Sequence, residues 1–344
     1  MRQILNTLYV MTPNAYLHLD NDTLRIDVEH EKKMQVPLHH IGSVVTFGDV
    51  MISPSAMHRC ADAGIALVLL DRNGRFKARL EGAVSGNILL RQAQHRVAGD
   101  GAFALNVAQA VIAGKLRNAR QVLQRGAREA DDADDGKCLN EATETLAHSI
   151  RKLPHASDLD KLRGIEGDAA KVYFSALPRL VRKSARESFT MDGRSRRPPR
   201  DRFNALISFL YSMVMNDCRS ALESVGLDPQ LGFLHAVRPG RAALALDLME
   251  EFRAILADRL ALTLINRGQI GAADFLEREG GAVTLDGDAR KTVVVAYQER
   301  KQEEITHPLL ETKVPIGLLP QLQARFMARA IRGEMEAYLP FLTK

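Results

Sequence analysis

The sequence predicts an α+β fold, in which a small β-rich domain at residues 1–85 precedes a larger all-helical domain at residues 86–344. Short apolar runs that alternate with polar residues, separated by Pro, Asn, Asp and Gly, fill the first part and are typical of strands. From about residue 86 the apolar residues recur at helical spacing instead. Because 344 residues exceed the usual length of one domain, about 150 residues, each part is expected to have its own core.

The first 85 residues are predicted to form short strands around one helix. Ser53 is a favourable N-cap, and Pro54 a favourable first residue, for a helix at residues 53–63. The sequence Asp20-Asn21-Asp22 indicates a tight turn, and Asn73-Gly74 indicates another before a strand at residues 75–80. The other strands are expected at residues 7–10, 16–19, 23–28, 33–37, 43–47 and 66–70.

The rest of the chain is predicted to be helical, apart from its connections and one small hairpin. The acidic run at residues 129–137 is interpreted as a solvated connection between helices. Residues 283–296 are expected to form the hairpin, with Asp286-Gly287-Asp288 as its turn. Helices are expected at residues 89–97, 104–128, 141–152, 159–163, 168–177, 204–227, from 244 to about 266, briefly from 271, at 298–305 and at 318–339.

Composition narrows the class of partner and the compartment. Lys and Arg outnumber Asp and Glu by 47 to 42, and the pI of about 9.1 favours phosphate polymers as partners. The three cysteines are isolated and lack CxxC spacing, which indicates a reducing cytosol and argues against a thiolate metal site. No run approaches the roughly 18 uncharged apolar residues of a membrane span, so we expect a cytoplasmic protein without a membrane partner.

A strongly basic segment lies at residues 178–202. It holds nine Lys or Arg against three acids, and Gly193, Pro198 and Pro199 make its last part a loop. This charge predicts a phosphate-binding edge, with a solvated helix face as the alternative. Aromatic residues are only 5% of the chain and there is no Trp, so recognition is expected to rest on backbone phosphates and shape rather than on stacked bases.

The segment Leu231–Asp258 combines a single histidine with a set of acids. His235 lies in a turn punctuated by Gly and Pro, and Asp247, Glu250 and Glu251 follow on one face of the predicted helix. One imidazole and one or two carboxylates, with a third ligand from elsewhere, predict a hard-cation site with open positions. The alternative is an amphipathic helix with a solvated acidic face. Its expected buried stripe is Leu244, Leu248, Phe252 and Ile255.

Glu166 is the second chemical candidate. It lies between Gly164 and Gly167, just before the helix expected from Asp168. A carboxylate there can simply favour the positive end of a helix dipole, worth up to about 1 kcal/mol. Alternatively, the glycines let backbone or a DNA phosphate approach while Glu166 points into a site. The segment alone leaves both interpretations open.

Three segments together resemble one known family. They are RGIEGDAAKVYF (163–174), RRPPRDRFNALISFLYSMVMNDCRSALESVGLDP (196–229) and GFLHAVRPGRAALALDLMEEFR (232–253). They are similar to the CRISPR-associated spacer-acquisition integrases, the Cas-one family, and most to the form found beside type I-C interference genes. The resemblance covers nearly the whole chain. It implies a homodimer made through the β-rich domain and a small ferredoxin-like CRISPR-associated partner of the Cas-two family.

The resemblance also implies a metal site. Glu166, His235 and Glu250 take the places of the family's ligands for Mg²⁺ or Mn²⁺. Many relatives have Asp where this chain has Glu250, which keeps the ligand type but changes the reach. Asp247 matches a second acid that is often present, as an accessory ligand or a residue behind the ligands. These four residues are the expected catalytic set.

The implied activity is that of a metal-dependent DNA endonuclease and integrase, a hydrolase of phosphodiester bonds that also transfers strands. It would join the 3′-hydroxyl ends of foreign DNA fragments into the CRISPR repeat array as new spacers, in antiviral defence. Double-stranded and branched DNA are the expected substrates. A structure-selective DNA repair nuclease and a non-enzymatic DNA-binding scaffold are the alternatives. The expected DNA-binding residues are Arg194, Arg196, Arg197, Arg200, Arg238 and Arg241.

Overall fold

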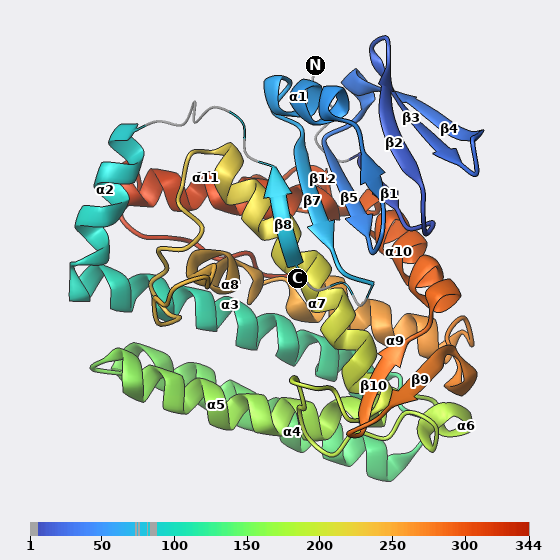
Figure 1. The fold of residues 1–344 in the computed structure, drawn as a ribbon. Helices are drawn as coiled ribbons and strands as arrows, with labels where there is room; N and C mark the ends of the chain where they lie inside the picture. Colours follow the sequence, from blue (N-terminus) through green and yellow to red (C-terminus); the bar gives the residue numbers. More distant parts are fainter. Residues whose placement is uncertain (1–5, 73, 75, 81, 83–87, 344) are drawn as a thin grey trace. The chain divides into compact units, whose positions relative to one another are not determined.

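The computed structural model describes residues 6–72, 74, 76–80, 82 and 88–343 (Figure 1). The chain divides into two compact units, Met1–Ser85 with Arg290–Gln302, and Gly86–Ala289 with Glu303–Lys344. Strands come first along the chain and helices dominate after them, which confirms the α+β prediction. Among the described residues no single helix is long and apolar enough to cross a membrane; one pair, bent by 97° at its break, meets the length and composition criteria only together.

The described part of the first unit contains two four-stranded sheets, helix α1 and most of helix α10 (Gly287–Gln302). In one sheet β1, β5 and β7 are parallel and β8 is antiparallel, in the order β1-β5-β7-β8. The other has the order β4-β3-β2-β6. The elements are β1 (Thr7–Val10), β2 (Tyr16–Asp20), β3 (Thr23–Val28), β4 (Glu31–Pro37), η1 (Leu38–His40), β5 (Ser43–Phe47), β6 (Met51–Ile52), α1 (Pro54–Asp62), β7 (Ala66–Leu70) and β8 (Phe76–Leu80).

The core of this unit joins both sheets to α1. Leu17 and Leu24 from the second sheet and Val44 from the first are fully buried in one cluster with Ala56 and Cys60 of α1. Ser53 caps α1 by accepting a hydrogen bond from the Ala56 amide at 3.2 Å, as the sequence predicts. The predicted strands are confirmed, and the short β6 was missed. The Asn73 position and the start of the strand expected from Arg75 lie outside the described residues.

The second unit is mainly helical. Helices α3, α4 and α5 lie side by side, and α7 is buried along most of its length (Figure 1). Its elements are α2 (Ile88–Ala98), α3 (Gly101–Arg128), α4 (Ala133–Lys152), η2 (Leu153–His155), α5 (Leu159–Ala176), η3 (Leu177–Leu180), α6 (Lys183–Arg186), α7 (Arg202–Ser224), α8 (Ala243–Met249), the π-helix η4 (Arg253–Asp258), α9 (Arg259–Asn266), η5 (Ala272–Asp274), β9 (Phe275–Arg278), β10 (Ala282–Leu285), β11 (Glu304–Thr306), β12 (Lys313–Pro315), η6 (Ile316–Leu318) and α11 (Leu319–Ile331).

Helix α5 corrects the prediction of a break around Glu166. It is continuous from Leu159 to Ala176, and its N-cap is Asp158, which accepts from the Lys161 amide at 2.8 Å. Two glycines inside a helix cost about 1 kcal/mol each, but burial of the apolar side of α5 offsets this. Glu166 therefore lies in mid-helix, and the helix-dipole interpretation is wrong.

The C-terminal predictions were wrong in four places. The segment expected as a helix at residues 298–305 is the end of α10 followed by the start of strand β11. The hairpin is formed by β9 and β10, and residues 292–296 belong to α10 (Gly287–Gln302). Gly280 and Gly281, with φ of 83° and 74°, provide the turn that the sequence analysis placed at Asp286-Gly287-Asp288. The short helix expected from residue 271 is one 3₁₀ turn leading into β9. The final helix ends at Ile331, because Gly333 follows in the left-handed region at φ 75°.

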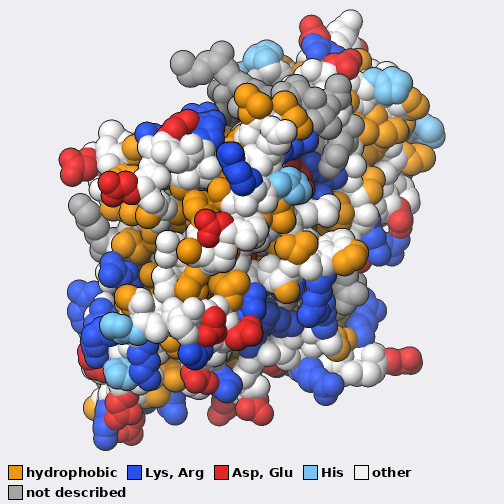
Figure 2. Space-filling view, turned by 90° about the vertical axis from the view of Figure 1, so that its left-hand side faces the viewer, with side chains coloured by type: hydrophobic (Ala, Val, Ile, Leu, Met, Phe, Trp, Pro, Cys, Tyr) orange, Lys and Arg blue, Asp and Glu red, His pale blue; other side chains and the backbone are white. Residues whose placement is uncertain are grey.

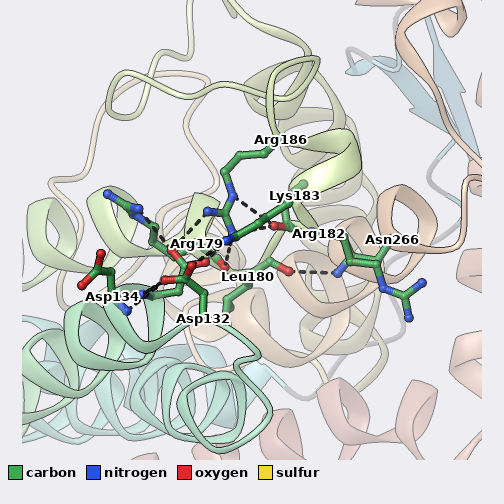
Figure 3. Close-up of polar contacts among 10 residues, drawn as sticks. Asp132, Asp134, Arg179, Leu180, Arg182, Lys183, Arg186 and Asn266 are labelled. Carbon is green, nitrogen blue, oxygen red and sulfur yellow. Dashed lines mark hydrogen bonds and ion pairs between the residues drawn. The ribbon is translucent and has the colours of Figure 1, made fainter.

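The acidic run at residues 129–137 is not merely a solvated connection. Asp132 caps α4, and Asp135 is buried and bonds Arg186 at 2.8 Å and Arg179 at 3.1 Å. Figure 3 shows Arg179, Lys183 and Arg186 converging on this helix start, with Lys183 bound to Asp132. Folding therefore accounts for these three cations, the first half of the basic segment.

We expect Asp135→Asn to lower the free energy of unfolding by about 2 kcal/mol at pH 7, because two guanidinium groups lose a buried anion. The Arg186 hydrogen bonds lower the pKa of Asp135 below 3.8, so its stabilisation is present above 3.8 and is lost as pH falls through the lowered value. Urea unfolding should show the two proteins converging in acid. Asp134→Asn, an exposed control, should change stability by less than about 1 kcal/mol, and equal effects would contradict the assignment.

Candidate metal and DNA site

Asp247 organises the turn that carries His235. This fully buried carboxylate accepts backbone N–H bonds from Phe233 at 2.6 Å, Leu234 at 3.0 Å and His235 at 3.0 Å. It also lies 2.7 Å from Nδ1 of the His235 ring. Since a carboxylate only accepts, Nδ1 carries the proton and Nε2 is the basic nitrogen. Asp247 thus fixes both the path of the turn and the tautomer of its histidine.

Two further residues hold this turn. Arg163 on α5 donates from Nε and Nη2 to the Leu234 carbonyl at 3.1 and 2.7 Å. Gly232 lets Asp247 approach the backbone, because a Cβ at position 232 would lie 2.6 Å from Asp247 Oδ2 and 2.7 Å from the Ala243 carbonyl carbon. The glycine in this turn therefore has a steric role.

Glu250 lies where α8 ends and is only 3% exposed. Its Oε1 is 2.9 Å from Arg253 Nη2 and 3.8 Å from His235 Nε2. Its Oε2 is 2.9 Å from Lys115 Nζ, an ion pair without hydrogen-bond geometry, so Oε2 is buried without a hydrogen-bond donor among the described residues. Burial alone would raise the pKa of Glu250, but Arg253 and Lys115 lower it to about 2. Glu250 is thus a buried anion.

Glu166 reaches the same place from α5. Lys115 Nζ donates a hydrogen bond to Glu166 Oε1 and also faces Glu250, so the two glutamates share one ammonium group. His235 Nε2 faces Glu250 from the turn that precedes α8. Glu166 and His235 therefore both lie near Glu250, although the Lys115 ammonium group lies between the two carboxylates.

The donor set fits a hard divalent cation, on one condition. No group of three or more His, Cys, Asp or Glu side chains in the described part of the chain is already arranged as a metal site. Two carboxylates and a basic imidazole nitrogen nevertheless are ligands that Mg²⁺ and Mn²⁺ accept, and the buried Glu250 Oε2 lacks a donor. The condition is that Lys115 moves. Both carboxylate oxygens of Asp247 instead accept hydrogen bonds from protein donors, so Asp247 is suited to orienting His235.

Glu251, the neighbour of Glu250, faces a different part of the fold. Its carboxylate accepts from Tyr338 Oη, from Gln323 Nε2 at 3.1 Å and from the Phe341 amide at 2.7 Å. Burial raises its pKa to about 8 despite these donors. The alternative of a solvated acidic face is therefore wrong, because Asp247, Glu250 and Glu251 are all buried. The stripe of Leu244, Leu248, Phe252 and Ile255 is buried as predicted.

The expected DNA-binding arginines differ in exposure. Arg196, Arg197, Arg200 and Arg238 are exposed, and Arg241 is partly buried. Arg194 is different: its guanidinium donates to Asn204 Oδ1 at 2.6 Å and to Ser208 Oγ at 2.9 Å. Burial lowers the pKa of Arg194 to about 10. Its contacts anchor the loop, and it is less available to a phosphate than its exposed neighbours.

Sequence reasoning missed Lys115, Arg163 and Arg253, which hold the site residues in place. Lys115 lies in the helix predicted at residues 104–128. One signal was present in Gly114, because a glycine inside a helix often marks a close approach. A Cβ there would lie 2.9 Å from Pro340 Cβ and 3.2 Å from Glu251 Cγ. Gly114 therefore lets α3 come close to Glu251 and Pro340.

A second group of exposed basic residues lies where α4 leads into α5. In the face that Figure 2 presents, Lys, Arg and His side chains gather along the lower edge. Lys161 is on the same helix as Glu166. The exposed members are His148, Arg151, Lys152, His155 and Lys161.

Comparison with known proteins points to one family. The family model "CRISPR associated protein Cas1" matches residues 8–299. A CRISPR-associated endonuclease Cas1 from Moorella thermoacetica is 56% identical over 342 residues, covering 99% of both chains. One from Rhodospirillum rubrum is 50% identical over 348 residues, covering 100% of both.

Solved structures show the same fold. A Cas1 protein from Thermotoga maritima superposes with a TM-score of 0.82 at 23% identity, covering 95% of this chain and 97% of that one. A casposase bound to integration product has a TM-score of 0.81 at 20% identity, covering 97% and 92%.

We expect Gly232→Ala to lower the free energy of unfolding by about 2 kcal/mol, because its Cβ would collide with Asp247 and the backbone at Ala243. Urea unfolding measures this, and the ring signals of His235 in nuclear magnetic resonance should shift as its bond to Asp247 is disturbed. Gly101→Ala is the matched control, since a Cβ there meets nothing within 4 Å and stability should change by less than about 0.5 kcal/mol. Equal stability of the two variants would argue against the close approach.

Proposed function

The chain belongs to the CRISPR-associated Cas1 family, and from this premise we propose that it is a metal-dependent DNA endonuclease and the integrase of CRISPR adaptation. The observation that carries the proposal is the meeting of Glu166 and Glu250 at one ammonium group, with the basic nitrogen of His235 beside Glu250. Carboxylates and an imidazole gathered from three chain segments are ligands that can hold a divalent ion for phosphodiester chemistry.

In this proposal Glu166, His235 and Glu250 hold Mg²⁺ or Mn²⁺. The ion supplies charge stabilisation for the scissile phosphate. Asp247 keeps His235 in the tautomer that presents Nε2, and Arg253 keeps Glu250 ionised inside the fold. Arg253 does so from a fixed position, since its guanidinium lies 4.8 Å from the Tyr211 ring centre.

The proposed reaction is a transesterification. The 3′-hydroxyl oxygen of an incoming DNA fragment attacks phosphorus in the CRISPR repeat, one phosphodiester bond forms, and one breaks to release a new 3′-hydroxyl. With water as the attacking group the same site gives hydrolysis, so strand cleavage is the expected side reaction. Exposed arginines of the basic loop bind the DNA phosphate backbone and do not contribute sequence specificity.

The partners follow from the same premise. One structural neighbour is a Cas6-RT-Cas1–Cas2 complex, and another is a casposase bound to integration product. We propose that this cytoplasmic chain forms a homodimer through its β-rich domain at residues 1–85, that residues 86–344 carry catalysis, and that the dimer joins a small Cas2-type partner. Its substrates are then double-stranded and branched DNA.

Removing a ligand tests the proposal. We expect Glu166→Gln to slow Mn²⁺-dependent joining of a labelled 3′-hydroxyl oligonucleotide to a repeat duplex by at least about 100-fold, and Asp247→Asn by about 10- to 100-fold, because the first changes a ligand and the second the orientation of one. Chelation of the metal should stop both joining and cleavage.

Glu141→Gln is the matched control, an exposed acid on α4 that should leave the rate unchanged. Full joining by Glu166→Gln would contradict the site. Cleaved product without any joined product in the wild-type reaction would favour a repair nuclease, and DNA binding without either product would favour a scaffold.

The basic loop should act through phosphates. We expect replacing Arg196, Arg197 and Arg200 with Gln to weaken DNA binding equally for all sequences and to reduce the salt dependence by about one counterion for each lost contact. Fluorescence anisotropy at several salt concentrations measures both. Arg125→Gln, exposed on α3, is the control. Arg194→Gln should instead lower stability, and an unchanged salt slope in the triple variant would remove the loop from the interface.

A further inference from the structure

Lys115 contacts two of the proposed ligands but has no task in the proposed function. Its ammonium group donates to Glu166 Oε1 and lies 2.9 Å from Glu250 Oε2, linking helices α3 and α5 to the end of α8. Its side chain is 13% exposed and that of Glu250 is 4% exposed. The Glu166 side chain is 26% exposed. Since Glu250 is poorly solvated, the two carboxylates would repel each other without a cation between them. Lys115 therefore neutralises the pair in the metal-free protein.

Glu250 has cations at both of its oxygens. Arg253 is 2.9 Å from Oε1, and Lys115 is 2.9 Å from Oε2. A divalent ion that bridges Glu166 Oε1 and Glu250 Oε2 would occupy the space of the Lys115 ammonium group, because that group contacts both of these oxygens.

Lys115 is the group that can leave. Arg253 lies over the Tyr211 ring and belongs to the π-helix η4, whose residues are largely buried. Lys115 has a flexible four-carbon side chain and lines a cavity together with Tyr173, Tyr211 and Asp258. That cavity gives its ammonium group a space to enter, with the Asp258 carboxylate in the wall.

We infer that Lys115 is a built-in counter-ion that holds Glu166 and Glu250 together before metal binding and competes with the divalent ion for them. This inference rests on the proposed function, since it takes Glu166 and Glu250 as metal ligands. Lys115 is thus a positioning residue, which keeps the buried Glu250 carboxylate and the partly exposed Glu166 carboxylate near each other at the expense of metal affinity. Its competition sets the divalent-ion concentration at which the site fills.

The test is Mn²⁺ affinity, measured by isothermal titration of the full chain. We expect Lys115→Met to bind Mn²⁺ at least about tenfold more tightly than wild type, because a competing unit charge is removed from a poorly solvated site. The same variant in chelator should melt at a lower temperature, since its buried carboxylates have lost their counter-ion. Mn²⁺ should restore the melting temperature by a larger shift than in wild type.

Arg117→Met is the matched control, because it removes the same charge from an exposed position on the same helix and should leave Mn²⁺ affinity unchanged. Lys115→Gln repeats the measurement if Lys115→Met does not fold. A purely structural Lys115 would lower the melting temperature without tightening Mn²⁺ binding, so equal or weaker binding in both Lys115 variants overturns the inference.

A separate pair of variants tests the premise. Glu166→Gln and His235→Ala, each made with Lys115 retained, should weaken Mn²⁺ binding relative to the wild type. If neither does, the proposed metal site is wrong and the inference falls with it. If both do while Lys115→Met and Lys115→Gln bind Mn²⁺ as wild type does, only the inference is overturned.

Discussion

The interaction on which the rest of the site depends is the burial of Asp247 beneath the His235 turn. One carboxylate satisfies the buried N–H groups of Phe233 and Leu234 and the partly buried N–H and ring nitrogen of His235. The bonds are short and charge-assisted, so the turn has little freedom. Because Asp247 is on α8 and Glu250 follows at its end, the same helix that orients the histidine also delivers the neighbouring carboxylate.

The acids around α8 show why proximity in sequence says little about role. Glu250 and Glu251 are adjacent and both buried, yet the pKa of Glu250 is lowered to about 2 and that of Glu251 is raised to about 8. Both are subject to burial, but only Glu250 faces Arg253 and Lys115, whereas Glu251 meets neutral donors. Glu250, which stays ionised, is suited to binding a cation. Glu251, whose raised pKa favours the protonated form, is suited to holding the C-terminal segment by hydrogen bonds.

Much of this was predictable from sequence where local patterns decide. Strand alternation, the Ser53 cap and the buried Leu244 stripe depend on neighbours a few residues away, and all were confirmed. The helix through Glu166 was mispredicted because local glycine propensity opposed tertiary burial, which prevailed. Lys115 was missed because its two partners come from distant segments. The sequence predicts the same DNA-binding role for Arg194 and Arg196. In the structure Arg194 is hydrogen-bonded to Asn204, whereas Arg196 is exposed.

The basic loop and the candidate metal site are linked through one aromatic ring. Arg194, at the start of the loop, lies 5.3 Å from the Tyr211 ring centre, and Arg253, the partner of Glu250, lies 4.8 Å from it. The Tyr211 hydroxyl donates to Asp258 at 2.8 Å, which fixes the ring inside the core. A ring held in this way sets the position of both guanidinium groups. The spacing between the basic loop and Glu250 is therefore a property of α7 and the π-helix.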